Sequence, residues 1–428
     1  MPHPDAQPET VFTYAAPQLV FGPGACGDIG HHLLARGARR VLVVTDEGVA
    51  GTGTPERIAE ELRLAGLVVE VFDGVHVEPT DASIAAAVTA ARASGPWDAF
   101  VAVGGGSSID TAKAVNLLLT NPGELMDYVN APVGGGRSPL NPVKPLVAVP
   151  TTTGTGSEST SICVLDVLDL HVKTGISHQT LRPVLAVIDP LVTMSQPPEV
   201  TAAAGMDILC HALESLTARP YTAFERKQPE QRVPYCGANP VSDLWAQKAL
   251  SLMSSAFRRA VRDGDDAQAR GDMALAATFA GFGFGNAGVH LPHANAYPIA
   301  GRVKDFRPAG YPTGEPMIPH GMAVSLTAPA SLRWTFDTAP ERHLAAARLL
   351  DPAAETTGDP AGLLPTVLLS IMRDVGMPAG LAAVGYGADD VPDLVEGTLR
   401  QERLLALSPR EVTAEDVAGL FTASMELW

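Results

Sequence analysis

DAFVAVGGGSSID, which occupies residues 98–110, indicates the architecture more clearly than any other part of the chain. The uncharged run Ala99–Val103 predicts a buried strand, and a helix is predicted over Asp110–Leu119. Between them, Gly104–Gly106 would let the backbone approach a phosphate closely, and the following helix N-terminus offers free N–H groups. The pattern is neither GxGxxG nor a Walker A loop. We interpret it as a phosphate-binding turn, the alternative being a glycine-rich turn without a ligand.

The segments around this turn alternate between strand and helix. ARRVLVVTDEGVA contains a predicted strand over Val41–Thr45, followed by a helix over Thr54–Ala65, a strand over Leu67–Phe72 and a helix over Asp81–Ser94. Such alternation is typical of a parallel sheet with crossover helices. We therefore predict a Rossmann-like α/β dinucleotide-binding domain over residues 1–196, with its ligand beyond the carboxyl ends of the strands.

Asp46 stands at the carboxyl end of an early strand. An acidic residue there commonly accepts hydrogen bonds from the ribose hydroxyls of a dinucleotide and repels a 2′-phosphate, which favours NAD over NADP. The alternative role is a helix cap.

A second polar loop, TTTGTGSE, begins at Thr151 directly after the predicted strand in KPLVAVP. Its hydroxyls suit a ribose or a nicotinamide amide, although a polar turn would have the same composition. Lys173 in HVKTGIS could reach a nucleotide hydroxyl or phosphate, or could be a solvated surface lysine. The candidate cofactor-binding residues are Asp46, Gly104, Gly105, Gly106, Ser107, Asp110, Thr151, Thr152, Thr155 and Lys173.

From Pro197 onward the strand pattern disappears. An Ala- and Leu-rich helix contains GMDILCHALESL, and further helices are predicted over 242–262, 265–280, 341–350, 360–375 and 414–427. The sequence therefore predicts a second, all-helical domain over residues 197–428.

The helical half contains a candidate metal site. Asp207 and His211 lie one turn apart on one helix face. His290, His293 and His320 follow in Gly285–Gly321, a segment rich in Gly, Ala and Pro that we expect to be loop-like. One carboxylate with two or three imidazoles would bind Fe(II) or Zn(II) and leave positions open for a substrate oxygen. The alternative for the Asp207–His211 pair alone is an ordinary helix surface.

Composition excludes several functions. With 30 basic and 47 acidic side chains the formal charge is −17, which argues against binding nucleic acid or an anionic membrane. The four cysteines are widely spaced without a CxxC pair, as expected for reduced cysteines in the cytoplasm. The N-terminus has no signal or transit pattern, and the longest uncharged run, Met273–Val289, is too short for a confident membrane span.

Three motifs, VAVGGGSSIDTAKAV, AVPTTTGTGSESTS and GMDILCHALES, resemble those of the iron-containing (group III) alcohol dehydrogenase family and occur in its order. The resemblance implies iron or zinc in a cleft between the two domains, held by one Asp and three His. It assigns the metal ligands to Asp207, His211, His293 and His320. The family's next histidine, near the nicotinamide, falls on Tyr297, and His290 is left as a supporting or core histidine.

HLxHxxxYPIxG, the insert before PHG and the C-terminal run resemble the hydroxyacid-oxoacid transhydrogenase branch of that family. The branch implies hydride transfer through bound NAD(H) between a hydroxyacid such as 4-hydroxybutyrate and a 2-oxoacid such as 2-oxoglutarate. It also implies a homo-oligomer, a dimer or larger. The lack of a presequence suggests a bacterial, cytoplasmic version. Tyr297 would either donate a proton through a hydrogen-bond chain or pack against the nicotinamide.

Both proposed substrates are carboxylates, so we expect a cation to bind them. Lys304 and Arg307 are the first candidates and Arg232 is the next, with solvated surface charges as the alternative. Two other functions stay open. One is a conventional NAD(P)-dependent alcohol dehydrogenase or aldehyde reductase with exchangeable cofactor, and the other is a non-catalytic metal- and nucleotide-binding protein.

Overall fold

The computed structural model describes residues 7–170, 172–232, 234–311, 314, 316–355 and 358–428. These residues form two compact units. One is Ala16–Gln196, and the other is Pro197–Trp428 together with the described residues up to Ala15. The units therefore divide between Gln196 and Pro197, whereas residues 7–15 group with the helical unit and not with the predicted 1–196 domain.

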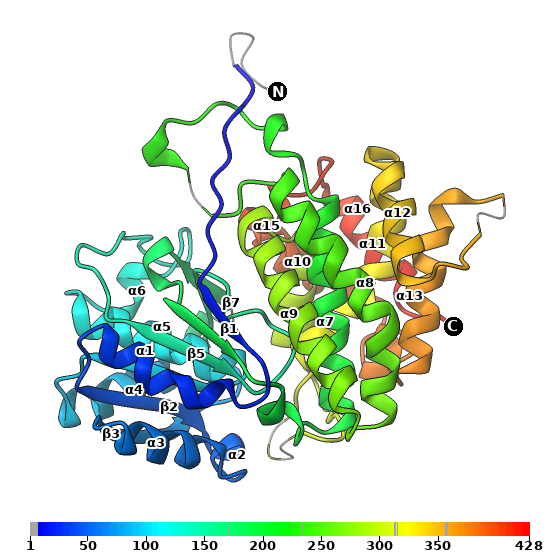
Figure 1. Cartoon of the computed structure of the whole chain (residues 1–428). Helices are drawn as coiled ribbons and strands as arrows, with labels where there is room; N and C mark the ends of the chain where they lie inside the picture. The colour runs from blue at the N-terminus through cyan, green and yellow to red at the C-terminus, as the bar shows by residue number, and fades with distance from the viewer. Residues whose placement is uncertain (1–6, 171, 233, 312–313, 315, 356–357) are drawn as a thin grey trace. The chain divides into compact units, whose positions relative to one another are not determined.

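The first unit contains a six-stranded, wholly parallel sheet in the order β1-β8-β5-β4-β2-β3 (Figure 1). Its strands are β1 Gln18–Phe21, β2 Arg40–Asp46, β3 Val68–Val75, β4 Ala99–Gly104, β5 Leu146–Pro150 and β8 Leu185–Ile188. A separate antiparallel hairpin joins β6 Ile162–Val167 to β7 Val172–Ser177.

Alternate side chains of the central strands enter two different cores. In β2, Val41 and Val43 pack with α1 (Ile29–Ala35) and α3 (Thr54–Leu64). Leu42 and Val44 pack with the helices on the opposite face, α4 Asp81–Ser94 and α5 Gly106–Thr120. Because both faces are covered, these strands are continuously apolar, as parallel strands usually are. The unit is thus the α/β fold that the sequence predicts.

The second unit is helical. Its longer helices are α7 Pro198–Thr217, α8 Pro240–Arg262, α9 Ala267–Ala287, α10 Leu291–Gly301, α11 His320–Thr335, α12 Pro340–Leu350, α13 Leu363–Asp374, α14 Val391–Leu399 and α16 Ala414–Ala423. Helix α7 is buried along nearly its whole length, and α8, α9 and α11 pack around it. No described helix is long and apolar enough to cross a membrane.

The structure corrects three local expectations. Helix α5 begins at Gly106 and not at Asp110, so Asp110 lies in its second turn. His293 and His320, for which we expected loop-like positions, lie in the first turns of the helices α10 and α11. Proline usually predicts a loop, but both helices tolerate proline where they begin. Pro292 lies in the first turn of α10, where no backbone N–H is needed, and Pro319 is the N-cap of α11.

The N-terminal segment is fastened to the helical unit by buried polar groups. Glu9 accepts hydrogen bonds from the backbone N–H of Lys227 at 3.0 Å and from Arg232 Nη2 at 3.4 Å. The side chain of Asn286 exchanges two hydrogen bonds with the backbone of Ala15. These contacts explain why residues 7–15 belong to the helical unit, although the chain enters the α/β unit directly after them.

Candidate active site

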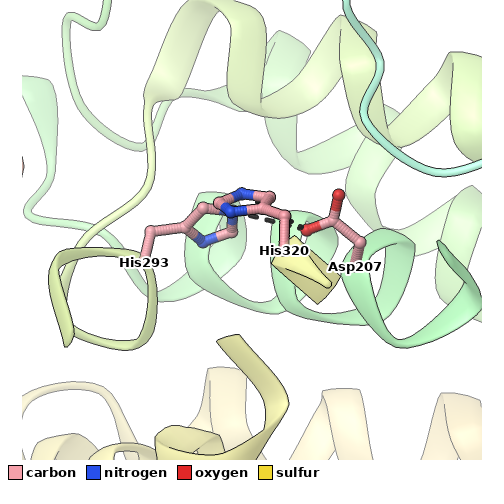
Figure 2. Close-up of side chains that lie close together, drawn as sticks. All are labelled: Asp207, His293 and His320. Carbon is pink, nitrogen blue, oxygen red and sulfur yellow. Dashed lines mark ion pairs between the residues drawn. The ribbon is translucent and has the colours of Figure 1, made fainter. Parts of the chain in front are cut away.

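Three predicted histidine ligands face one carboxylate oxygen of the fourth predicted ligand, Asp207. Figure 2 shows two of them, His293 and His320, beside Asp207. Asp207 and His211 come from α7, His293 from the first turn of α10, and His320 is the first residue of α11. Asp207 Oδ1 lies 3.7 Å from His211 Nε2, 3.6 Å from His293 Nε2 and 3.9 Å from His320 Nε2. The ligand atoms of Asp207, His293 and His320 all lie within 4.8 Å of one another.

These distances fit a shared divalent ion better than direct hydrogen bonds. They exceed the usual N–H···O range, whereas a tetrahedral ion with bonds near 2.0–2.1 Å holds its donors roughly 3.3 Å apart. Among the residues that the structure describes, the buried atoms Asp207 Oδ1 and His293 Nε2 have no hydrogen-bond partner. A ligand set of Asp and His suits Fe(II) or Zn(II).

The charges of the site also suit a cation. Burial opposes the charge of Asp207, but the surrounding imidazoles, His211 first, hold its pKa well below the ordinary value. Burial lowers the pKa of His211 to about 3, so this imidazole is neutral and available as a ligand. Its ring stacks on Phe284 of α9, with centroids 3.8 Å apart.

Glu214 is a site residue that our sequence analysis missed. It is fully buried on α7, and its Oε1 lies 2.5 Å from His293 Nδ1. Because a carboxylate only accepts, Nδ1 carries the hydrogen and Nε2 is left facing Asp207. Burial lowers the pKa of His293, yet the carboxylates of Glu214 and Asp207 together raise it to about 9. The sequence signal was present, since positions 207, 211 and 214 share one helix face.

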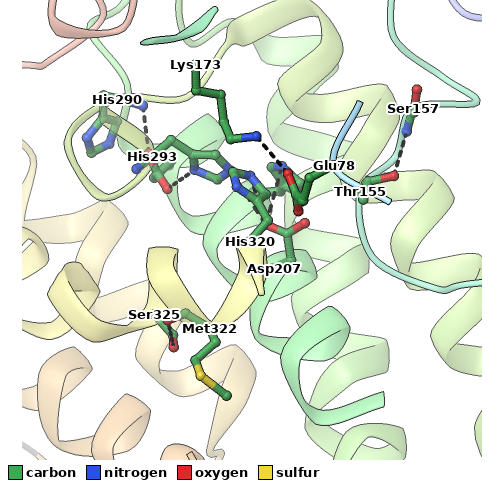
Figure 3. Close-up of polar contacts among 12 residues, drawn as sticks. Glu78, Thr155, Ser157, Lys173, Asp207, His290, His293, His320, Met322 and Ser325 are labelled. Atoms are coloured by element: carbon green, nitrogen blue, oxygen red, sulfur yellow. Dashed lines mark hydrogen bonds and ion pairs between the residues drawn. The ribbon is translucent and has the colours of Figure 1, made fainter. Parts of the chain in front are cut away.

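His290 takes no part in the convergence on Asp207. Its ring is buried with Nε2 3.0 Å from Thr217 Oγ1, and burial lowers its pKa to about 4. Its backbone N–H donates to Glu214 Oε2 at 2.7 Å (Figure 3). His290 therefore holds the carboxylate that orients His293.

Tyr297 lies beside the candidate metal site. It follows His293 by one turn of α10, and its ring meets the ring of His320 edge to face with centroids 6.3 Å apart. This position is compatible with either role considered for its phenol.

In the α/β unit, the glycine loop and the threonine loop pack against each other. A Cβ added to Gly105 would lie 3.0 Å from Thr152 Oγ1, and one added to Gly106 would lie 2.9 Å from Thr155 Oγ1. Thr151 N donates to Gly104 O at 3.0 Å. The glycines are therefore needed for the close approach of the two loops.

Asp46 and Ser107 also join this region. Asp46 Oδ1 caps the short helix α2 (Glu47–Ala50) by accepting from Val49 N, and Oδ2 accepts from Ser108 Oγ, each at 3.0 Å. Ser107 Oγ accepts from Glu78 N at 3.0 Å. The helix cap that we considered as an alternative for Asp46 is thus present, and ribose binding stays a prediction.

Two predicted cofactor residues are engaged with the protein. Asp110 faces inward, where Oδ2 accepts from Val164 N at 2.9 Å. Lys173 is buried and not a solvated surface lysine: its Nζ lies 2.7 Å from Glu78 Oε2 and 2.8 Å from Asp166 Oδ2 (Figure 3).

The three candidate substrate cations each contact a different partner in the protein. Lys304 is exposed, with Nζ 2.7 Å from Asp390 Oδ2. Arg307 is exposed and donates to the carbonyl of Asp305 at 3.3 Å. Arg232 is paired with Glu9. Their contact with a substrate carboxylate stays a prediction.

Comparison with known proteins agrees with this geometry. The family model described as iron-containing alcohol dehydrogenase matches residues 16–190. The model described as the C-terminal part of the Fe-containing alcohol dehydrogenase family matches residues 230–425. The mitochondrial hydroxyacid-oxoacid transhydrogenase of Rattus norvegicus is 44% identical over 422 residues, which are 97% of this chain and 90% of the relative.

Solved structures show the same relationship. A 1,3-propanediol oxidoreductase superposes with a TM-score of 0.84 at 30% identity, over 97% of this chain and 100% of that chain. A sulfoacetaldehyde reductase from Bifidobacterium kashiwanohense in complex with NAD+ gives 0.80 at 26% identity, over 96% and 98%. The chain belongs to the iron-containing alcohol dehydrogenase family and, within it, to the hydroxyacid-oxoacid transhydrogenase branch.

Proposed function

We propose that this oxidoreductase moves a hydride, through bound NAD(H), between a hydroxyacid such as 4-hydroxybutyrate and a 2-oxoacid such as 2-oxoglutarate. The observation that carries the proposal is the convergence of three imidazoles on Asp207 Oδ1, a buried atom without a hydrogen-bond partner among the described residues. The transhydrogenase relatives support the choice of substrates.

A divalent ion at this position, Fe(II) or Zn(II), would supply Lewis-acid chemistry to an alcohol or carbonyl oxygen. Asp207 provides the negative charge that binds the ion, and His211 provides a neutral donor. His293, whose pKa is raised to about 9, would release a proton when the ion binds. Glu214 holds His293 in the tautomer that leaves Nε2 open. Tyr297 moves or holds a proton at its phenol oxygen, next to His320.

NAD(H) supplies the hydride chemistry, and we assign its binding to the glycine and threonine loops. Three close approaches support this assignment, at Gly104, Gly105 and Gly106. Asp46, at the end of β2, favours NAD over NADP because its charge repels a 2′-phosphate. The NAD+ complex of the sulfoacetaldehyde reductase supports NAD binding on this fold.

The second candidate is a conventional NAD(P)-dependent alcohol dehydrogenase or aldehyde reductase with exchangeable cofactor. The similarity to a 1,3-propanediol oxidoreductase favours it. The two functions differ in whether the nucleotide stays bound while the first product leaves.

One reaction distinguishes them. The iron-loaded protein is mixed with 4-hydroxybutyrate and 2-oxoglutarate without added nucleotide, and 2-hydroxyglutarate is followed. Several turnovers per site would establish transhydrogenation on a retained cofactor. Product that forms only after NAD or NADP is added would establish the conventional dehydrogenase instead. The same protein treated with a chelator is the control for metal dependence.

We also propose a cytoplasmic, homo-oligomeric enzyme, a dimer or larger. The four cysteines are all free, as in a reducing compartment. Cell fractionation and light scattering of the purified chain test these two statements.

A further inference from the structure

Lys113 is a buried lysine that neither the metal site nor the predicted cofactor contacts use. It lies on α5, about two turns after the glycine loop, and its side chain is 0% exposed. Its Nζ donates to Ser157 Oγ at 2.7 Å and to Ile162 O at 2.6 Å, and it lies 3.2 Å from both Asp110 Oδ1 and Thr160 Oγ1. A buried ammonium group is costly unless it is this fully bonded.

Asp110 completes a cluster that joins three segments. It accepts hydrogen bonds from the Ser157 hydroxyl and from Val164 N, the latter at 2.9 Å. The cluster therefore connects α5 with the threonine loop, Thr151–Ser161, and with the start of β6. That loop is described throughout and contains no helix or strand, so turn hydrogen bonds, such as Ser159 N to Gly156 O at 2.9 Å, and side-chain contacts fix its path.

The same loop forms one side of the candidate cofactor site. Thr152 and Thr155 pack against Gly105 and Gly106, and the Asp110–Lys113 cluster holds the following residues, Ser157 and Thr160. Arg182 Nη1 also donates to Ser159 O of this loop at 2.8 Å. A shift of Ser157 would move Thr155, because Thr155 Oγ1 accepts from Ser157 N at 3.3 Å (Figure 3).

We propose that Asp110 and Lys113 are positioning residues of the cofactor site, which hold the threonine loop against the glycine loop so that both contact NAD(H). This inference rests on the proposed assignment of the two loops to the cofactor. Asp110, which we expected to contact the cofactor, acts from behind the loop.

The test is the affinity for NAD, measured by isothermal titration with the full chain after any bound nucleotide has been removed. Lys113→Met removes the charge and the three donors but keeps most of the volume. We expect the dissociation constant to rise roughly tenfold or more, because the loop is no longer preorganised, while bound metal stays unchanged. Ser157→Ala is a milder variant that breaks only the link to the loop, with an expected rise of about threefold to tenfold.

A double variant separates positioning from simple stabilisation. Lys113→Met with Asp110→Asn leaves no unpaired buried charge, so the melting temperature should recover relative to Lys113→Met alone. NAD affinity should stay low, since the link through Lys113 is still missing. The control is Asn116→Leu, because Asn116 also ties α5 to another segment, through two hydrogen bonds to the backbone of Lys144, which precedes β5. It should lower stability and leave NAD affinity unchanged.

Unchanged NAD affinity in both Lys113→Met and Ser157→Ala would overturn the inference. Recovery of NAD affinity together with melting temperature in the double variant would also overturn it, because the cluster would then be only structural. If the unaltered chain binds no NAD, the proposed function fails, and the inference fails with it.

Discussion

Two buried carboxylates, Asp110 in the α/β unit and Asp207 in the helical unit, have opposite surroundings. Both oxygens of Asp110 accept hydrogen bonds from groups of the chain itself. Asp207 Oδ1 faces three imidazoles at 3.6–3.9 Å without a hydrogen bond among the described residues. The chain itself satisfies the hydrogen-bonding capacity of Asp110, whereas Asp207 and its three histidines form the donor set of a metal site.

Hydrogen bonding separates a structural buried charge from a functional one. A buried charge that is fully hydrogen-bonded stabilises one arrangement of the chain. A buried group that is left unpaired costs free energy and is retained where a ligand compensates it. The following variants test the distinction, and their expected effects decrease from the first to the last.

Removing the central carboxylate should have the largest effect. We expect Asp207→Ala to lose its bound metal and more than about 1000-fold of kcat/KM, because all the ligand distances meet at Oδ1. Metal analysis of the purified protein and steady-state kinetics measure both. The control is Asp243→Ala, which breaks an ion pair with Arg342 in the same unit and should keep its metal. Retention of a full equivalent of metal by Asp207→Ala would contradict the assigned site.

Tyr297→Phe should lower kcat on the order of 100-fold if the phenol relays a proton. The metal content should not change, since the distances that define the metal site do not involve the phenol. Tyr386→Phe is the matched control, because it removes a buried hydroxyl of the same unit that donates to Ile299 O at 2.6 Å. An unchanged kcat for Tyr297→Phe would assign this ring to packing against the nicotinamide.

Glu214→Gln should weaken metal binding by roughly 10–100-fold, as loss of a carboxylate behind a ligating histidine usually does. The side-chain amide of the new glutamine can donate to His293 Nδ1. This favours the tautomer with the hydrogen on Nε2, which cannot bind a metal through Nε2. A competition titration with a chelator gives the affinity. Glu158→Gln, at a buried glutamate of the α/β unit, is the control and should leave metal affinity unaltered. Equal affinities for the wild type and Glu214→Gln would remove Glu214 from the site.

Substituting an exposed cation should have the smallest effect on the kinetics. Lys304→Met should raise KM for the oxoacid by only about twofold to fivefold, because an exposed charge is screened by solvent. KM for an uncharged aldehyde should stay the same. Lys248→Met, at another exposed lysine, controls for net charge. If both substrates respond equally to Lys304→Met, this lysine does not bind the carboxylate.

Much of the α/β unit could be predicted because its signals are local. Uncharged runs predicted β2 and β4, and the strand–helix alternation placed α4 at its observed bounds, Asp81–Ser94. The glycine loop follows its strand directly in the sequence. Side chains a few residues apart decide such elements, so the sequence alone establishes them.

The helical unit was less predictable where helices contain proline and small residues. We expected loop-like positions for His293 and His320, which lie in the first turns of α10 and α11, because Pro and Gly usually interrupt helices. Burial against α7 and α14 compensates for their weak helix propensity. The sequence also did not predict that residues 7–15 pack with the helical unit, because the hydrogen-bond partners of Glu9 and Asn286 are far away in the sequence.

The residues themselves specify which groups are available: a Gly-rich turn, a Thr-rich loop, and Asp207 and His211 on one helix face. Only the tertiary structure brings His293 and His320 to Asp207, places Glu214 behind His293 and encloses Lys113 with Asp110. The physical reason is that helix packing sets the rotation of each helix about its axis, and this rotation decides which buried polar atoms are hydrogen-bonded and which face a common point.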